Sequence, residues 1–159
     1  MYCESIMSAN PTSIRHDAKI RDAIHLMDER HMQVLMVTDD TGHFVGEVSI
    51  YQFAKVLLPR SVFAEYDAHD EEAQRETLAD VAHRLVPYLD RVIKDFVDHD
   101  VPVVRPKTPL TDALLLLRGG ALRIPVVDDP NQTLVGAVSM LTILRAVADL
   151  AEAEASAGT

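Results

Sequence analysis

The chain is poor in several residue types, and these shortages exclude whole classes of protein. Its single cysteine, Cys3, excludes an internal disulfide framework and favours a reducing compartment. Aromatic residues make up only 5% of the chain, and 15 Lys and Arg face 25 Asp and Glu, for a net charge of −10. A protein with this balance lacks the basic face that binds nucleic acid or anionic membranes.

Long apolar runs are also missing. No stretch approaches the roughly 20 consecutive apolar residues of a membrane span. The first residues lack the basic region and apolar run of a signal peptide. Hydrophobic content of 48% and charged content of 25% are typical of globular proteins, and 159 residues are enough for one compact domain. We therefore expect a cytoplasmic protein that binds neither nucleic acid nor a membrane.

The sequence carries no recognisable catalytic or metal-binding motif. It contains no Gly-x-Ser-x-Gly turn, no Walker-type glycine-rich loop and no catalytic Cys/His signature. The seven histidines never fall at i, i+4 spacing and none adjoins a cysteine pair. We predict that the protein is not an enzyme and holds no metal.

What the chain does contain is an internal repeat. Residues 12–55 align with residues 102–145 at a constant offset of 90 positions, without a gap. Arg15 falls on Arg105, and the best match places Val45–Ser49 on Val135–Ser139. A duplication of this length indicates two copies of one supersecondary unit, each too small to bury its apolar face alone.

Each copy has the pattern of strand, helix, strand, strand and helix. The helices are predicted from apolar residues at i, i+3, i+4 and i+7, namely Ile20, Ala23, Ile24 and Met27, and Leu110, Ala113, Leu114 and Leu117. Hairpins are predicted from the β-branched runs 34–37 and 124–127, the polar turns after them, and the partner runs 44–48 and 134–138. Closing helices begin near Ile50 and Met140.

The predicted organisation has four parts. Residues 1–57 form the first repeat, 58–93 an acidic and partly helical connector, 94–150 the second repeat, and 151–159 an Ala/Glu-rich frayed tail. The connector carries one helix with apolar residues from Leu78 to Leu89, interrupted near Pro87. It is either a solvated acidic link or a helix that binds a partner.

The segment Arg123-Ile124-Pro125-Val126-Val127-Asp128 and the two Gly-x-Val-Ser turns resemble those of the cystathionine-β-synthase (CBS) domain, and the pair resembles a Bateman module. The resemblance implies an α/β (α+β) fold of two βαββα repeats, packed sheet to sheet about a pseudo-twofold axis. It also implies clefts between the repeats that bind AMP, ADP, ATP or S-adenosylmethionine, and pairing of the protein into a homodimer.

Several residues are candidates to hold such a ligand. Ser49 and Ser139 lie where a strand gives way to a helix, and the backbone N–H groups of a helix start accommodate phosphate or ribose oxygens. Arg123 offers a planar cation for phosphate. The candidate apolar walls for adenine are Val101, Pro102, Ile124 and Pro125 in the second copy, with Thr12 and Leu35 in the first.

One departure from the family pattern affects ribose recognition. Ligand-binding CBS repeats usually have an aspartate three residues after the Ser or Thr, where the resemblance assigns it to the ribose hydroxyls. This chain has Gln52 and Thr142 there, and neither presents two charged acceptor oxygens. Ser49 and Gln52 also have the S-x-x-Q form of a capping box, which explains the glutamine without a ligand.

Three functions remain open on this basis. The leading hypothesis is a regulatory module that binds an adenine nucleotide or adenosyl ligand in the inter-repeat cleft and responds with a conformational change. The alternative is a dimerising interaction scaffold of the same fold that has lost the ligand. A third is an accessory domain of an enzyme whose partner chain carries the chemistry.

Overall fold

The computed structural model describes residues 1–58 and 77–158, which form two compact units. The first-repeat unit contains residues 13–39 and 45–99, and the second-repeat unit contains residues 1–12, 40–44 and those from 100 onward. Each unit has a three-stranded sheet with helices, so the predicted α/β class is confirmed. The acidic stretch of the predicted connector, 59–76, lies outside the described residues.

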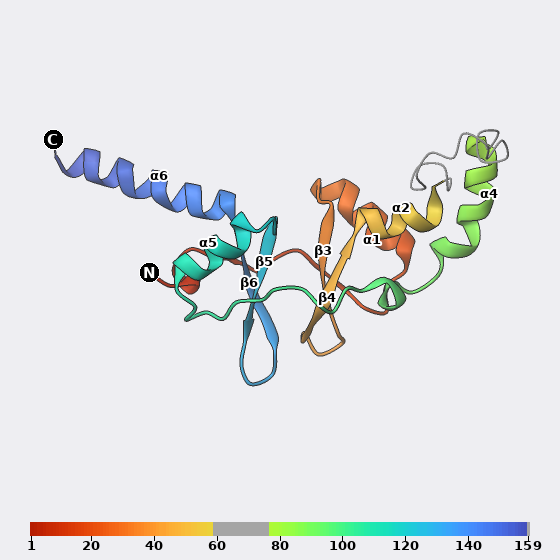
Figure 1. The fold of residues 1–159 in the computed structure, drawn as a ribbon, viewed down its shortest axis with the longest axis horizontal. Coiled ribbons are helices and arrows are strands. Elements are labelled where there is room, and N and C mark those ends of the chain that lie inside the picture. The colour runs from red at the N-terminus through yellow and green to blue at the C-terminus, as the bar shows by residue number, and fades with distance from the viewer. Residues whose placement is uncertain (59–76, 159) are drawn as a thin grey trace. The chain divides into compact units, whose positions relative to one another are not determined.

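The first-repeat unit follows the predicted order of elements (Figure 1). Its sheet has the order β2-β3-β4, with β2 parallel to β3. The elements of the repeat are β2 (Ser13–Arg15), α1 (Ile20–Arg30), β3 (Val34–Thr38), β4 (Phe44–Ser49) and α2 (Ile50–Leu57), and α4 (Leu78–Leu89) and the 3-10 helix η3 (Ile93–Phe96) complete the unit.

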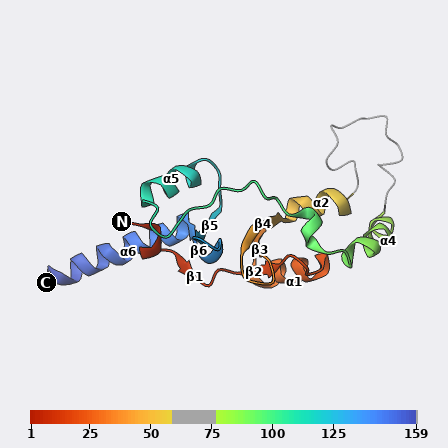
Figure 2. The same cartoon turned by 90° about the horizontal axis from the view of Figure 1, so that it is seen from below.

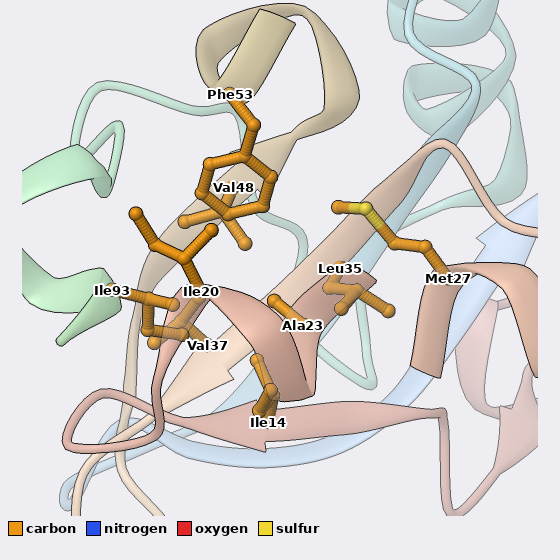
Figure 3. Packing of buried hydrophobic residues seen from close by; sticks show 9 residues of the cluster. All are labelled: Ile14, Ile20, Ala23, Met27, Leu35, Val37, Val48, Phe53 and Ile93. Atoms are coloured by element: carbon orange, nitrogen blue, oxygen red, sulfur yellow. The ribbon is translucent and has the colours of Figure 1, made fainter. Parts of the chain in front are cut away.

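The core of this unit forms where the apolar stripe of α1 meets the sheet. Ala23 and Met27 of α1 lie over Leu35 and Val37 of β3, and the whole cluster of nine residues is buried (Figure 3). The ring of Phe53 in α2 packs edge-on against Phe96 of η3, with 6.0 Å between the ring centroids. Burying each large aliphatic or aromatic side chain contributes about 1.5–3 kcal/mol, so this cluster is the main source of the unit's stability.

Helix α4 passes through the proline that was expected to interrupt it. Thr77 caps the helix by accepting a hydrogen bond from the backbone of Asp80, and the helix continues to Leu89. The prediction of a break near Pro87 is therefore wrong. Pro87 lies in the last turn of the helix. Proline has no N–H to donate to the preceding turn, and the helix ends at Leu89, soon after this missing donor.

The second-repeat unit has the same architecture with longer hairpin strands. Its antiparallel sheet has the order β1-β6-β5 (Figure 2). The elements are the 3-10 helix η1 (Cys3–Ser5), β1 (Ser8–Ala9), α5 (Leu110–Arg118), β5 (Arg123–Asp128), β6 (Thr133–Ser139) and α6 (Met140–Ala157). The core gathers buried residues from α5, β5, β6 and α6 around Cys3, which is a free thiol.

Each unit includes a short segment from outside its own repeat. Residues 1–12 precede the first repeat but belong to the second-repeat unit, and the segment up to residue 99 precedes the second repeat but belongs to the first-repeat unit. Strand β1 pairs antiparallel with β6 through Ser8 and Ala137, although residues 1–12 come before the first repeat. Likewise the N–H of Glu47 donates to the carbonyl of Asp98, and the N–H of Asp98 donates back, at 3.0 and 2.8 Å. The compact units therefore exchange short segments relative to the predicted repeats, 1–57 and 94–150.

Helix α6 also differs from expectation at its end. It continues without interruption from Met140 to Ala157. The segment from 151 to 157, which was expected to belong to a frayed tail, is therefore the second half of this helix. Its alanine and glutamate residues are good helix formers, which accounts for the continuation.

The two repeats differ by one residue in the length of chain between the first strand and the strand that follows the first helix. The parallel bridges join Ile14 to Val37 in the first repeat and Val104 to Val126 in the second. Ile14 and Val104 are 90 positions apart, but Val37 and Val126 are 89 apart. The gap-free alignment is therefore wrong across β3 and β5, where the true counterpart of Arg123 is Val34.

The shift begins in the turn before the strand and ends in the hairpin. The left-handed residue after the first helix is His31 (φ 53°) in one repeat and Gly120 (φ 109°) in the other, again 89 positions apart. A bulge between Val126 and Val127 in the β5/β6 ladder accompanies the return to an offset of 90. Because a slip of one residue turns every side chain to the opposite face, the turns absorb the difference and the core keeps its pattern.

Gly46 allows the Asp98 segment to lie against β4. A Cβ at this position would collide with the Asp98 carbonyl oxygen and the Val97 side chain, and the backbone has φ of +151°. Gly136 plays the same part in the other unit, where Met7 and Ser8 lie close. In both sheets glycine is required because a neighbouring segment lies too close to the strand for a Cβ.

We expect Gly46→Ala to lower the free energy of unfolding by about 2–4 kcal/mol, since overpacking adds to backbone strain. Gly42→Ala is the matched control, because Gly42 also has a positive φ (+86°) but nothing lies within 4 Å of its Cβ position. It should cost only about 1–2 kcal/mol of strain. Urea unfolding of both variants measures the difference, and equal losses would contradict the role assigned to the Asp98 segment.

Candidate functional site

The clearest candidate site lies at the edge of the second-repeat sheet where β6 runs into α6. Arg123 is the first residue of β5, Ser139 is the last residue of β6, and the two are directly paired in the antiparallel ladder. Directly opposed residues project on the same face of a sheet. The guanidinium and the hydroxyl therefore belong to one face, next to the N-terminus of an 18-residue helix.

Ser139 is the N-cap of α6 and keeps part of its hydrogen-bonding capacity. Its Oγ accepts a hydrogen bond from the backbone N–H of Thr142 at 3.2 Å. The hydroxyl proton is not needed for this cap and can be donated to an oxygen of a ligand. A cap, a planar cation and a helix N-terminus together suit an anionic group such as phosphate.

Thr142 uses its hydroxyl for the cap of α6. Its hydroxyl accepts from the Ser139 N–H at 2.9 Å and donates to the Ser139 carbonyl at 2.8 Å, and the residue is buried. In the other unit, Oε1 of Gln52 accepts from the Ser49 N–H at 2.7 Å, and Ser49 Oγ accepts from the Gln52 N–H. Both residues at the family's aspartate position thus complete capping boxes.

The apolar candidates are divided between exposed positions and the cores. Val101 is half-buried and Pro102 is exposed, and the parallel bridge of Val104 to Val126 directs this segment toward the Arg123 end of β5. Ile124 belongs to the core cluster and Pro125 is also fully buried, so neither offers a free wall.

The two wall candidates from the first copy, Leu35 and Thr12, differ in the same way. Leu35 is fully buried in the core, as its counterpart Ile124 is. Thr12, which falls in the other unit, is half-buried just before β2. Burial of Leu35 follows from strand alternation, because it must face α1 for the unit to have a core.

The corresponding edge of the first-repeat sheet is acidic. Glu47 lies two residues before Ser49 on the same face of β4, and Asp98 is bridged to it through the backbone. Burial, and then the nearby Asp98 carboxylate, raise the pKa of Glu47 from 4.5 to about 7. The equivalent positions of the second-repeat unit are Ala137 and Ser8, which carry no charge. An anion is therefore favoured at only one of the two edges.

This acidic pair was missed at the sequence level. The signal was present, because extending the offset of 90 backward aligns Ser8 with Asp98. The aligned segments, 12–55 and 102–145, include Glu47 but not Asp98, and pairing of strands across repeats is not visible in a periodic pattern. Among the residues that the structure describes, no group of three or more His, Cys, Asp or Glu side chains could hold a metal ion. No helix within 1–58 or 77–158 is long and apolar enough to cross a membrane.

Comparisons with known proteins agree with the repeat architecture. The model of the CBS domain matches the chain twice, at residues 3–59 and 93–149. Among solved structures, the CBS-pair protein CBSX2 from Arabidopsis thaliana is 23% identical with a TM-score of 0.73, over 95% of this chain and 96% of that one. CBSX2 in complex with AMP is 24% identical, with a TM-score of 0.67 over 94% and 97%. A CBS domain pair/ACT domain protein from Thermotoga maritima is 23% identical, with a TM-score of 0.63 over 94% and 98%. No curated protein matches the sequence.

The raised pKa of Glu47 predicts a stability that falls with rising pH. The folded protein keeps this carboxyl protonated to about pH 7 whereas the unfolded chain ionises near 4.5, so stability is lost between these values. We expect Glu47→Gln to match the wild type at pH 4 and to be more stable by about 1–2 kcal/mol at pH 8, allowing for partial exposure.

Urea unfolding at pH 4, 6 and 8 measures this difference. Glu29→Gln removes an exposed carboxylate from α1 and is the matched control. If the Glu47→Gln and wild-type curves stay parallel over this range, the electrostatic account of the first-repeat edge is wrong.

Proposed function

The chain belongs to the CBS domain family, and from this membership we propose that it is a regulatory module that binds an adenine nucleotide beside Arg123 and Ser139. The observation that carries the proposal is the direct pairing of these two residues at the N-terminus of α6. The complex of CBSX2 with AMP supports an adenine nucleotide as the first ligand to test, since that protein shares the fold. ADP, ATP and S-adenosylmethionine are the other candidates.

Phosphate is the part of the ligand that this edge suits best. Arg123 supplies a charged, planar donor set, and the Ser139 hydroxyl and the α6 backbone add neutral donors. Val101 and Pro102 are placed to contact an apolar ring near the Arg123 end of β5. Binding favours whichever conformation of the protein contacts the ligand best, and that shift in population is the proposed signal. We propose that the protein acts as a homodimer.

The ligand-free scaffold remains a second candidate on one specific observation. Gln52 and Thr142 are both used in capping boxes, so the family's aspartate has been replaced by groups that already have partners. In that case the fold serves dimerisation or partner binding without a small-molecule signal.

Isothermal titration calorimetry with AMP, ADP, ATP and S-adenosylmethionine tests the leading proposal. We expect Arg123→Ala to weaken AMP binding about tenfold or more, because a hydrogen bond to a charged group is worth about 1.5–3 kcal/mol, and to change adenosine binding little. Arg118→Ala, which removes an exposed arginine from α5, should leave both affinities unchanged. Heat from none of the four ligands would remove the proposal, and equal losses for AMP and adenosine would remove the role of Arg123.

The capping boxes predict weak discrimination by the sugar. Because neither Thr142 nor Gln52 offers a carboxylate to the ribose hydroxyls, AMP and 2′-deoxy-AMP should bind within about threefold of each other. Competition of the two nucleotides for the same site measures this ratio. A preference for AMP of about thirtyfold or more would mean that another acceptor, not assigned above, holds the diol.

A further inference from the structure

One backbone hydrogen bond of the first repeat cannot form in the second. In the first repeat the N–H of His16, the residue after β2, donates to the carbonyl of Thr38 in β3 at 2.8 Å. The matching residue of the second repeat, 90 positions later, is Pro106, which has no N–H. One step of the ladder between this segment and its parallel neighbour is therefore missing in the second-repeat unit.

The carbonyl left without this donor belongs to Val127 of β5. Where the segment before Pro106 pairs with β5, the N–H of Val104 donates to the Pro125 carbonyl at 3.0 Å. The next donor of a parallel ladder would be residue 106, and the next acceptor on β5 lies two residues beyond Pro125, at Val127. Val127 is fully buried, and a buried carbonyl without a donor costs free energy.

The side chain of Arg105 supplies the missing donor. Its Nη1 donates to the Val127 carbonyl at 3.0 Å, where the first repeat uses a backbone N–H. Two further residues hold the guanidinium in place. Oε1 of Gln132 accepts from Nη1 and Nη2 at 3.2 and 3.3 Å, and a carboxylate oxygen of Asp129 lies 3.4 Å from Nη2. We call these contacts of Arg105 with Val127, Gln132 and Asp129 the Arg105 clamp.

Arg15, the counterpart of Arg105 in the first repeat, makes no such clamp. Its Nη2 donates to Asp17 at 2.8 Å, and 57% of its side chain is exposed, against 37% for Arg105. The first repeat has three residue pairs between β2 and β3, whereas the second has the single parallel bridge of Val104 to Val126. The clamp thus occurs in the repeat whose first strand has less backbone pairing.

The segment held by the clamp also carries the proposed contacts to the base of the nucleotide. From the bridge at Val104 this segment runs parallel to β5, so Val101 and Pro102 lie toward the Arg123 end and Arg105 toward the other end. A wall that is ordered before the ligand arrives spares binding the cost of ordering it. A change at Arg105 can therefore alter contact with the base and leave the phosphate-binding edge intact.

We propose that Arg105 is a positioning residue for the ligand base. By replacing the donor that Pro106 lacks, it holds residues 101–105 on β5 and so fixes the wall formed by Val101 and Pro102. Its part differs from that of Arg123, which is proposed to contact the phosphate. The inference rests on the proposed function for its ligand, whereas the clamp itself can be tested without one.

Amide hydrogen exchange of the full chain, measured by NMR without nucleotide, tests the clamp. Arg105→Ala should speed exchange of the Val104 and Val127 amides about fivefold or more, because both donate across the pairing that the clamp supports. Arg15→Ala removes the same side chain from the matching position and is the control. It should change these two rates by about twofold at most. Unchanged rates in Arg105→Ala would overturn the clamp.

Restoring the backbone donor should reverse the effect. In the double variant Arg105→Ala/Pro106→Ala, the N–H at position 106 can donate to Val127 as that of His16 does to Thr38, so exchange should return to within about threefold of the wild type. A double variant that exchanges as fast as Arg105→Ala would show that the guanidinium does not replace a backbone donor. If Arg105→Ala does not fold, Arg105→Lys keeps the charge without the planar fork and should speed exchange about threefold.

Calorimetry with AMP, adenosine and ribose 5-phosphate tests the positioning role. Arg105→Ala should weaken AMP and adenosine by the same factor, about fivefold, because both carry the base. Ribose 5-phosphate has the phosphate but no base, and its affinity should stay within about twofold. Arg123→Ala should show the opposite pattern, with losses for AMP and ribose 5-phosphate and little change for adenosine.

The outcomes separate the two proposals. An equal loss for all three ligands would mean that Arg105 only maintains the fold, and no loss for AMP would mean that it does not position the base; either result overturns the inference while nucleotide binding stands. If the wild type binds none of the three ligands or the other nucleotides, the proposed function fails and the positioning role fails with it. The exchange rates then still decide whether Arg105 replaces the donor missing at Pro106.

Discussion

The alternation of side chains along a strand is the constraint on which the rest of this structure depends. Leu35 and Val37 must face α1 in one unit, and Ile124 and Val126 must face α5 in the other, because these residues form the cores. The two repeats contain different numbers of residues between helix and strand, and only the turns and a bulge absorb the difference. That adjustment brings Arg123 to the first position of β5, opposite Ser139.

The duplication has therefore produced two edges of unequal chemistry from one architecture. One edge carries Arg123 beside a helix N-terminus, and the other carries Val34 in its place together with the Glu47 and Asp98 carboxyls. Backbone geometry is common to both, since glycine allows a paired segment to lie close to the strand at Gly46 and at Gly136. Charge and not backbone geometry distinguishes the two edges, so the proposed phosphate-binding edge occurs once per chain.

The repeat pattern was sufficient to predict the family, the α/β class and the order of elements within each repeat. It failed where the chain departs from strict periodicity. A gap-free alignment placed Gln33 opposite Arg123, because a one-residue change in a turn leaves the apolar runs overlapping almost as well. The role of Thr142 could not be predicted either, since the same hydroxyl can serve a cap or a ligand and only its two bonds to Ser139 decide between them. Helix propensity alone would have extended α6 to Ala157.

The placement of residues 1–12 within the second-repeat unit has a consequence for how the chain folds. Strand β1 is an edge strand for β6, which lies on the far side of the whole first repeat in the sequence, and Asp98 bridges Glu47 across the acidic connector. Contacts between positions so distant in sequence slow folding, because a long loop must close before any contact is gained. The β2-β3-β4 sheet forms from one continuous stretch of chain, whereas the β1-β6-β5 sheet is complete only when segments on either side of the first repeat have met.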